Sequence, residues 1–420
     1  MNIYYLLTLL FLLLSCKANF FFYTDAVWLA LEAVLLAVGV YRKRITHRDV
    51  KLILVFSGVY LAYVLFRFPF NGLPISYLVS DFFFLMKFLV TAYLFCVVLR
   101  EKTLFYLVKV ITHLAALSLV FFALQFVGGG KILQATGGAV NALVPNLSGG
   151  GYTNFFVFTY DSLHWYRNSG FCWEPGAFGC FLCLASLFNF FQNGFRFDRD
   201  AIILAIALLT TFSTTSYFAF SLILLLRFRY RNPKNKAALI GFGLVMLVAV
   251  PNISFLGEKI VEIYKKDLAD LENIHTLSKY YEEVQRELPL NRFGSIIFLH
   301  EKFGQKLWLG VSNQYDQVYR SNLNINISNG VMDFSAKFGY LGLLFLFYRF
   351  SRLCKQYVKN WEYVLYCVLA LLVLGFGEPI FILPICLLFI FLPGYTLSSS
   401  LQRLDLRSTQ NPELAFPVYV

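Results

Sequence analysis

Long apolar runs, separated by short polar segments, repeat along almost the whole chain. A helix needs about 20 mostly apolar residues to cross the bilayer. Spanning segments are helical because unpaired backbone polar groups are costly in lipid. Several runs reach this length and others come close to it. We therefore predict an all-α polytopic membrane protein with about twelve transmembrane helices, at 3–22, 26–41, 51–68, 77–99, 103–127, 175–194, 201–213, 215–228, 237–256, 331–350, 361–377 and 379–395.

The composition supports this prediction. Hydrophobic residues make up 58% of the 420 residues and charged residues only 14%. Soluble proteins average about 45–50% and about 25%, respectively. A soluble globular enzyme, a disordered chain and a disulfide-linked secreted domain are therefore excluded. The sequence has no evident internal repeat or long linker, so a single integral membrane domain over 1–420 is the simplest organisation.

The basic residues are distributed unevenly, and the formal net charge is +12. More than half of the Lys and Arg residues lie in loops that share one side of the membrane if the N-terminus is cytoplasmic, for example at 42–51, 227–236 and 349–359. Such a bias orients helical membrane proteins. We predict cytoplasmic N- and C-termini, and we do not expect a nucleic-acid partner.

Two segments on the opposite side are long enough to do more than connect helices. The segment at 128–174 begins with clustered glycines, which allow unusual backbone paths. In the segment at 257–330, apolar residues recur every three or four positions from Glu258 to Leu288, as in an amphipathic helix or helix pair. We predict an extracytoplasmic loop at 128–174 and a helical extracytoplasmic cap at 257–330.

The string RNSGFCWEPG begins at Arg167 and contains the start of a predicted helix. Pro175 suits the first helical turn, where no N–H is needed, and Glu174 lies at the positive end of the helix dipole. Arg167 and Glu174 could hold an anionic head group and a sugar hydroxyl. They could equally anchor the helix at the membrane interface, and the sequence leaves both interpretations open.

Other polar side chains lie at helix ends. Hydroxyls cluster in TTFSTTS at 210–216, where two apolar runs fold back on each other. They could line a sugar or phosphate site, or form a simple hairpin turn. Glu378 lies at a helix break, where it could line a cavity. Asp333 and Lys337 have the i,i+4 spacing of an ion pair on one helix face.

Four motifs follow one another between 167 and 345. They are RxxGxxxEP at Arg167–Pro175, TxSTTS at 211–216, an arginine, Arg292, ahead of a helix ending in LGV at 309–311, and SN followed by FGYLG within 328–342. Together they resemble O-antigen polymerases of the Wzy type, which share a superfamily with the O-antigen ligases. The resemblance implies a GT-C-like membrane fold.

The resemblance also implies an activity. Such glycosyltransferases join oligosaccharide repeat units carried on undecaprenyl diphosphate, at the outer face of the bacterial cytoplasmic (inner) membrane. The product would be O-antigen, capsule or another exopolysaccharide. The expected partners are this lipid-linked oligosaccharide, membrane lipid and a chain-length regulator protein. No metal and no cofactor is expected, because arginines can neutralise a diphosphate.

The resemblance assigns roles to particular residues. Arg167 and Arg292 would neutralise the leaving diphosphate by bidentate hydrogen bonds. Glu174 would orient Arg167 or accept the proton of the attacking hydroxyl, and no other general base is identified. Seven further residues would bind substrate, namely Trp173, Ser213, Thr214, Thr215, Ser216, Ser328 and Asn329.

Two alternatives remain open. An O-antigen ligase is disfavoured because Ser328 stands where many ligases have His, and Thr214 where they have Arg. A flippase or transporter of lipid-linked oligosaccharide belongs to a different class and would suit twelve spans. Transporters often contain internal repeats, however, and the outside cap has no evident purpose in a flippase.

Overall fold

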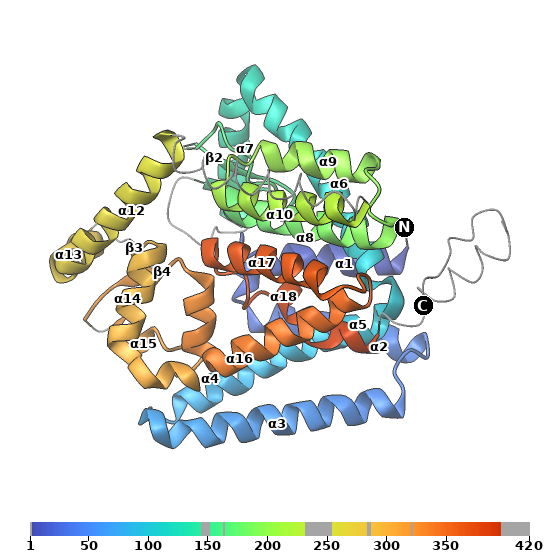
Figure 1. Cartoon of the computed structure of the whole chain (residues 1–420), viewed down its shortest axis with the longest axis horizontal. Helices are drawn as coiled ribbons and strands as arrows, with labels where there is room; N and C mark the ends of the chain where they lie inside the picture. Colours follow the sequence, from blue (N-terminus) through green and yellow to red (C-terminus); the bar gives the residue numbers. More distant parts are fainter. Residues whose placement is uncertain are drawn as a thin grey trace, which may run out of the picture.

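The computed structural model describes residues 2–143, 152–162, 164–231, 254–283, 287–320 and 322–395. This part of the chain is mostly helical (Figure 1). Its first half contains α1 (Ile3–Ser15), η1 (Phe20–Phe22), α2 (Asp25–Tyr41), α3 (His47–Asn71), α4 (Ser76–Phe84), η2 (Leu85–Val90), α5 (Thr91–Leu99), η3 (Arg100–Lys102), α6 (Thr103–Leu124), η4 (Gln125–Gly129) and α7 (Gly130–Leu143).

The second half adds further helices and two very small sheets. Strand β1 (Tyr152–Asn154) pairs antiparallel with β2 (Thr159–Asp161), and β3 (Leu288–Leu290) pairs parallel with β4 (Ile325–Ile327). The helices are α8 (Pro175–Asn193), α9 (Arg199–Leu209), α10 (Thr214–Arg231), α12 (Ser254–Glu272), α13 (Ile274–Glu283), α14 (Arg292–Phe303), η5 (Gly304–Trp308), α15 (Gln317–Arg320), α16 (Gly330–Lys355), α17 (Trp361–Gly377), α18 (Pro384–Phe391) and η6 (Leu392–Gly394).

Each predicted apolar run coincides with helical structure, except the run at 237–256, which lies largely outside the described residues. Within the described residues, four helical stretches are long and apolar enough to cross a membrane. They are His47–Asn71, Ser76–Val127, Pro175–Asn193 and Gly330–Lys355. The protein is thus a mostly helical membrane protein, and the total of twelve spans stays a prediction.

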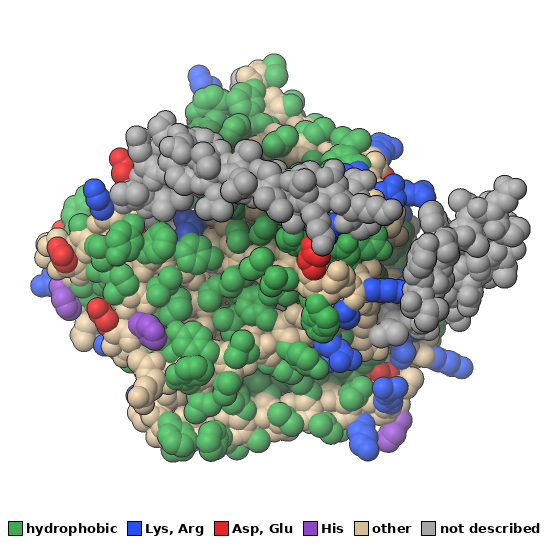
Figure 2. Space-filling view, in the orientation of Figure 1, with side chains coloured by type: hydrophobic (Ala, Val, Ile, Leu, Met, Phe, Trp, Pro, Cys, Tyr) green, Lys and Arg blue, Asp and Glu red, His purple; other side chains and the backbone are tan. Residues whose placement is uncertain are grey.

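Helix α3 has the surface expected of a lipid-facing span. It runs along one edge of the molecule (Figure 1), and Leu54, Val55 and Val59 are each more than half exposed. Contiguous exposed apolar surface of this kind is unusual in a soluble monomer. Apolar side chains also cover much of the face in Figure 2. Contact with lipid tails explains both observations.

Helix α8 lies at the centre of the membrane part. All of its residues from Pro175 to Phe191 are buried. A helix that is apolar on every side belongs inside a bundle. It packs against α6, α9 and α10, while α17 lies between α10 and α16. This arrangement surrounds the start of α8 with neighbouring helices.

Basic side chains gather at one end of the bundle. In Figure 2 they are most frequent at the right-hand end, which in Figure 1 is where α2 leads into α3 and α16 leads into α17. The loops there contain the predicted basic clusters at 42–51 and 349–359. The cap segment, including α13 and α14, lies at the opposite, left-hand end. The bundle therefore has two chemically different ends.

The segment predicted as a cap is helical, as expected. The periodic stretch forms α12 and α13, and a separate apolar core joins α14, the β3–β4 sheet and the start of α16. Leu299, Tyr315 and Ile325 lie in this core and are nearly inaccessible to solvent. The cap is thus packed onto the first turns of a membrane helix rather than tethered by a loose loop.

The LGV and FGYLG motifs meet where the cap joins α16. Gly310 (φ 74°) and Gly339 (φ 73°) both have left-handed backbone conformations, which favour glycine. A Cβ on either residue would overlap the backbone of the other segment. Val311 N also donates to Ala336 O at 2.7 Å. These glycines allow two chain segments to pack backbone against backbone.

A buried ion pair fixes α3 and α4 to the same junction. Arg67 Nη2 lies 2.6 Å from Asp81 Oδ2, and both side chains are at most 3% exposed. Arg67 Nη1 also donates to Lys337 O, and Asp81 Oδ1 accepts from Asn313 N at 2.7 Å. Charges at this depth persist only when paired and hydrogen-bonded. The pair therefore couples two membrane helices to the cap.

The segment at 128–174 has more structure than a loop. Residues Gly130–Leu143 form helix α7 despite the clustered glycines, and β1 and β2 follow as a small hairpin. Phe158 and Tyr160 pack with Leu133 of α7 in a small core of their own. Burial of these aromatic rings offsets the entropic cost of glycine in a helix.

Candidate functional site

The ends of five helices meet at one place in the fold. Contacts described below join the starts of α8, α10, α14 and α16 and the end of α17. Helix starts expose unpaired N–H groups and partial positive charge, so such a meeting point suits anionic groups. In Figure 1 it lies in the left half of the view, away from the basic loops.

A pair of carboxyl groups forms the centre of this site. Glu378 follows the last residue of α17 and is only 6% exposed, and its carboxyl is hydrogen-bonded to that of Glu174. Two adjacent carboxyls can form such a bond only if they share a proton. Trp173 Nε1 donates to Glu174 Oε1 at 2.5 Å. Glu174 is therefore held between an indole N–H and a second carboxyl.

Gly176 makes room for this carboxyl pair. It lies in the first turn of α8, and a Cβ at this position would overlap Glu378 Oε1. The carboxyl of Glu378 thus lies directly over the backbone at the start of α8. The positive end of the helix dipole stabilises negative charge there.

Arg292 lies close to the pair. Its Nη2 atom lies 3.8 Å from Glu378 Oε1 and donates to Gly377 O at 3.1 Å. Its Nε atom is buried and has no hydrogen-bond partner among the described residues. The side chain is 32% exposed. Arg292 therefore retains N–H groups for a ligand.

The start of α14, which carries Arg292, is held from outside the helix. Asp267 of α12 accepts from Phe293 N and Gly294 N, both at 3.1 Å. Asn291, the residue before the helix, makes no capping bond of its own. A carboxylate at a helix N-terminus satisfies free N–H groups and favours the dipole. Asp267 is thus a positioning residue for Arg292.

Arg167 approaches from the segment before α8. Its Nε atom donates to Thr211 O at 3.0 Å, and its charge acts on Glu378. Asn168 fixes this segment to the turn after α9, with Asn168 N donating to Thr210 O at 2.9 Å. Arg167 is held by the turn, and the structure describes no direct bond from it to Glu174.

Burial raises the pKa of the Glu378 carboxyl well above its usual range. The charge of Glu174 and the hydrogen bond from it raise this pKa further, whereas Arg292 and Arg167 lower it. When the pair shares one proton, two arginines face a single negative charge. The site then has a net positive charge and attracts anions.

The hydroxyls predicted to bind sugar divide into two groups. Ser213 and Ser216 are at most 5% exposed, and Ser216 Oγ lies 3.0 Å from Ser213 Oγ and 3.4 Å from Gly176 O. They pack the turn against α8. Thr214 and Thr215 are half-buried, and Thr215 contacts Gly377. Of these four side chains, the two threonines retain accessible surface near the site.

Ser328 and Asn329 support the backbone beside Arg292. Ser328 Oγ donates to Leu290 O at 2.7 Å, and Asn329 Nδ2 donates to Arg292 O at 3.1 Å. Asn329 Oδ1 also accepts from Met332 N at the start of α16. Their described polar contacts are with the backbone, so they are placed to position Arg292.

Two residues of the site had no chemical role assigned from the sequence, although Glu378 was expected to be able to line a cavity. Glu378 was noticeable as an acid at a helix break, but nothing in the sequence indicated that it contacts Glu174. Asp267 lies among many charged residues of α12 and carries no distinguishing local signal. Both depend on contacts between segments that are distant in the chain.

Comparison with protein-family models, with characterised proteins and with solved structures finds no match for this chain.

Proposed function

We propose that the protein is a polymerase that joins undecaprenyl-diphosphate-linked oligosaccharide repeat units by glycosyl transfer. The observation that supports this best is the placement of Arg167 and Arg292 around the Glu174–Glu378 pair. Two arginines suit a diphosphate leaving group, and a carboxyl pair suits the proton of an attacking hydroxyl. The four motifs that resemble Wzy-type polymerases contribute three of these four residues.

The reaction needs two changes at one anomeric carbon. The bond from this carbon to the diphosphate oxygen breaks, and its electron pair stays on the diphosphate. Arg167 and Arg292 stabilise the developing charge in a site largely screened from water. A hydroxyl of the incoming unit forms the new bond to the anomeric carbon, and its proton moves to the carboxylate of the pair. Glu378 is the proposed acceptor, and the proton that it already holds passes to Glu174 through the hydrogen bond between the two carboxyls.

The proposed setting follows from the two different ends of the bundle. We place the basic end and both termini in the cytoplasm and the site at the outer face of the bacterial inner membrane. About twelve spans in a GT-C-like arrangement would surround it. Growing chain and incoming unit would both be anchored in the outer leaflet, where a chain-length regulator would have access.

Glycan banding in a deletion strain tests the proposal. A strain that lacks a polymerase should still attach single repeat units to their acceptor, whereas loss of a ligase or a flippase should leave no units attached. Expression of the wild-type protein should restore long chains, and Arg292→Ala should not. Arg196→Ala, which changes an exposed arginine between α8 and α9, serves as the control and should restore them. Unchanged chain lengths in the deletion strain would refute the proposal.

A further inference from the structure

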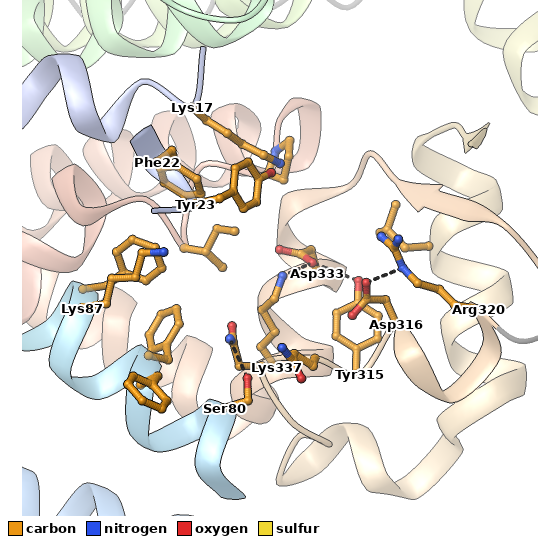
Figure 3. A pocket seen from close by; sticks show the side chains of 18 of the residues that line it. Lys17, Phe22, Tyr23, Ser80, Lys87, Tyr315, Asp316, Arg320, Asp333 and Lys337 are labelled. Atoms are coloured by element: carbon orange, nitrogen blue, oxygen red, sulfur yellow. Dashed lines mark hydrogen bonds and ion pairs between the residues drawn. The ribbon is translucent and has the colours of Figure 1, made fainter. Parts of the chain in front are cut away.

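Figure 3 shows a cavity, of about 590 Å³, whose lining reaches the residue next to the carboxyl pair. Pro379, the residue after Glu378, lines it, and so does Lys17. The Lys17 ammonium interacts electrostatically with both Asp333 and Glu174 and lies 5.8 Å from the ring centroid of Trp173. The cavity is therefore adjacent to the proposed reaction centre and large enough for a small-molecule ligand.

Three of the four cations that line the cavity among the described residues are paired with carboxylates. Lys337 Nζ lies 2.6 Å from Asp333 Oδ1, and Lys87 Nζ lies 2.9 Å from Asp25 Oδ1. A third pair joins Arg320 and Asp316 at 2.7 Å. The fourth cation, Lys17, interacts electrostatically with Asp333 and Glu174, so the cavity has no group of free cations to select a strongly anionic ligand. The cavity differs in this respect from the arginines of the carboxyl site.

The cavity wall also offers hydrogen-bond acceptors and aromatic surface. Asp333 is 6% exposed, and its Oδ2 atom has no partner among the described residues. Tyr315 OH donates to Asp333 Oδ1 at 2.9 Å and holds the carboxylate in place. The rings of Phe22 and Tyr23 line the other side (Figure 3). A polyhydroxyl ligand matches this wall, because hydroxyls donate to carboxylates and C–H faces pack on aromatic rings.

A second hollow in the protein has the opposite character. It measures about 360 Å³ and lies between α3 and α16, lined almost entirely by apolar side chains such as Phe56, Phe338 and Leu341. The hydroxyl of Tyr63, which also lines it, is already bonded to Phe338 O at 2.9 Å. A lipid tail suits that groove. In the first cavity, by contrast, a lipid tail would leave the charged pairs without polar contacts.

We propose that the 590 Å³ cavity binds the uncharged oligosaccharide of the incoming repeat unit and presents its hydroxyl to the carboxyl pair. This inference rests on the proposed function. Ser80 of α4 and Asn326 of β4 line the cavity from different elements and would contact the sugar. Lys17 lines the cavity and interacts electrostatically with Glu174, so it links the two parts of the site.

Cysteine protection tests this site directly. The eight native cysteines are all buried, so Ser80→Cys introduces an accessible thiol into the cavity wall. The probe is the free repeat-unit oligosaccharide, released by mild acid from the lipid-linked pool of the producing cells. At about ten times its Kd it should slow maleimide labelling of Ser80→Cys about tenfold. Labelling of Ala135→Cys, on an exposed position of α7, should not change.

Each contrary result overturns the assignment. Equal labelling with and without oligosaccharide would exclude sugar binding in the cavity. Stronger protection by inorganic diphosphate would indicate an anion site, and protection by undecaprenyl phosphate alone a lipid site. Glycan extension by the wild-type protein is measured separately. Extension by the wild type without protection of Ser80→Cys overturns only this inference, and protection without extension by the wild type overturns the proposed polymerase function.

Discussion

Replacement of Glu378 by Gln should make the protein more stable at neutral pH and, at the same time, inactive. Glutamine has almost the same size, stays neutral at every pH and can still hydrogen-bond to Glu174. It therefore removes the cost of burying a charge at a position that is only 6% exposed. It also removes the proposed proton acceptor, and loss of a general base lowers rates by about 10²–10⁴-fold.

The size of the stability change follows from proton binding. In the unfolded chain Glu378 loses its proton near its ordinary pKa of 4.5, whereas in the folded protein it keeps the proton to a higher pH. Between these two values the folded state holds one proton more, so the wild type loses about 1.4 kcal/mol of stability per pH unit as pH rises. The Gln variant has no such loss. From about pH 5 to about pH 7 the difference should therefore grow as pH rises, at no more than this rate.

Thermal unfolding of both purified proteins at these two pH values measures the difference. The stability of the Gln variant relative to the wild type should increase as pH rises, and this advantage should disappear towards pH 4. Glu272→Gln changes an exposed carboxyl on α12 and serves as the control, with an effect within about 0.5 kcal/mol. A Gln variant that is less stable than the wild type at neutral pH would show that Glu378 is held as a charged group by its arginines. The reasoning would then be wrong.

Three further predictions concern other parts of the fold. Arg67→Leu should lower the free energy of unfolding by about 3–5 kcal/mol, because Asp81 would stay buried without its cation. Adding Asp81→Leu to the same chain should recover part of the lost stability. If the stability losses of the two substitutions simply add, the coupling is refuted. Gly176→Ala should displace the Glu378 carboxyl and abolish glycan extension. Gly58 has open space around it, so Gly58→Ala should leave extension unchanged. An active Gly176→Ala protein would contradict the close contact between Gly176 and the Glu378 carboxyl. A membrane-impermeant maleimide should label His275→Cys but not Lys51→Cys from outside the cell, and the reverse pattern would invert the proposed orientation.

Local patterns in the sequence predicted the helical elements well. Apolar runs located the helices because a segment buried in lipid or in a bundle needs apolar residues along its whole length. The start of α8 at Pro175 and the ion pair of Asp333 with Lys337, at 2.6 Å, were both predicted and are confirmed. Each of these features depends on residues within a few positions of one another, so spacing alone is sufficient.

Long-range contacts could not be predicted in the same way. The hydrogen bond between Glu174 and Glu378 joins residues far apart in the chain, and neither one identifies the other. The sequence also did not show in which direction the polar side chains point. Ser213, Ser216, Ser328 and Asn329 have the residue types of a sugar site, but their described hydrogen bonds are with the backbone or, between the two serines of the turn, with each other. The residue type tells which hydrogen bonds a hydroxyl or amide can form, but not which partner it bonds to in the folded protein.

A reaction with purified protein tests the central claim most directly. The wild-type protein, incubated with undecaprenyl-diphosphate-linked repeat units, should produce a ladder of glycans on the lipid carrier, with or without a metal chelator. Arg167→Ala and Arg292→Ala should leave single units, while Arg196→Ala should give the full ladder. Single units from the wild type, or a full ladder from both arginine variants, would contradict the account of two guanidinium groups acting on one diphosphate.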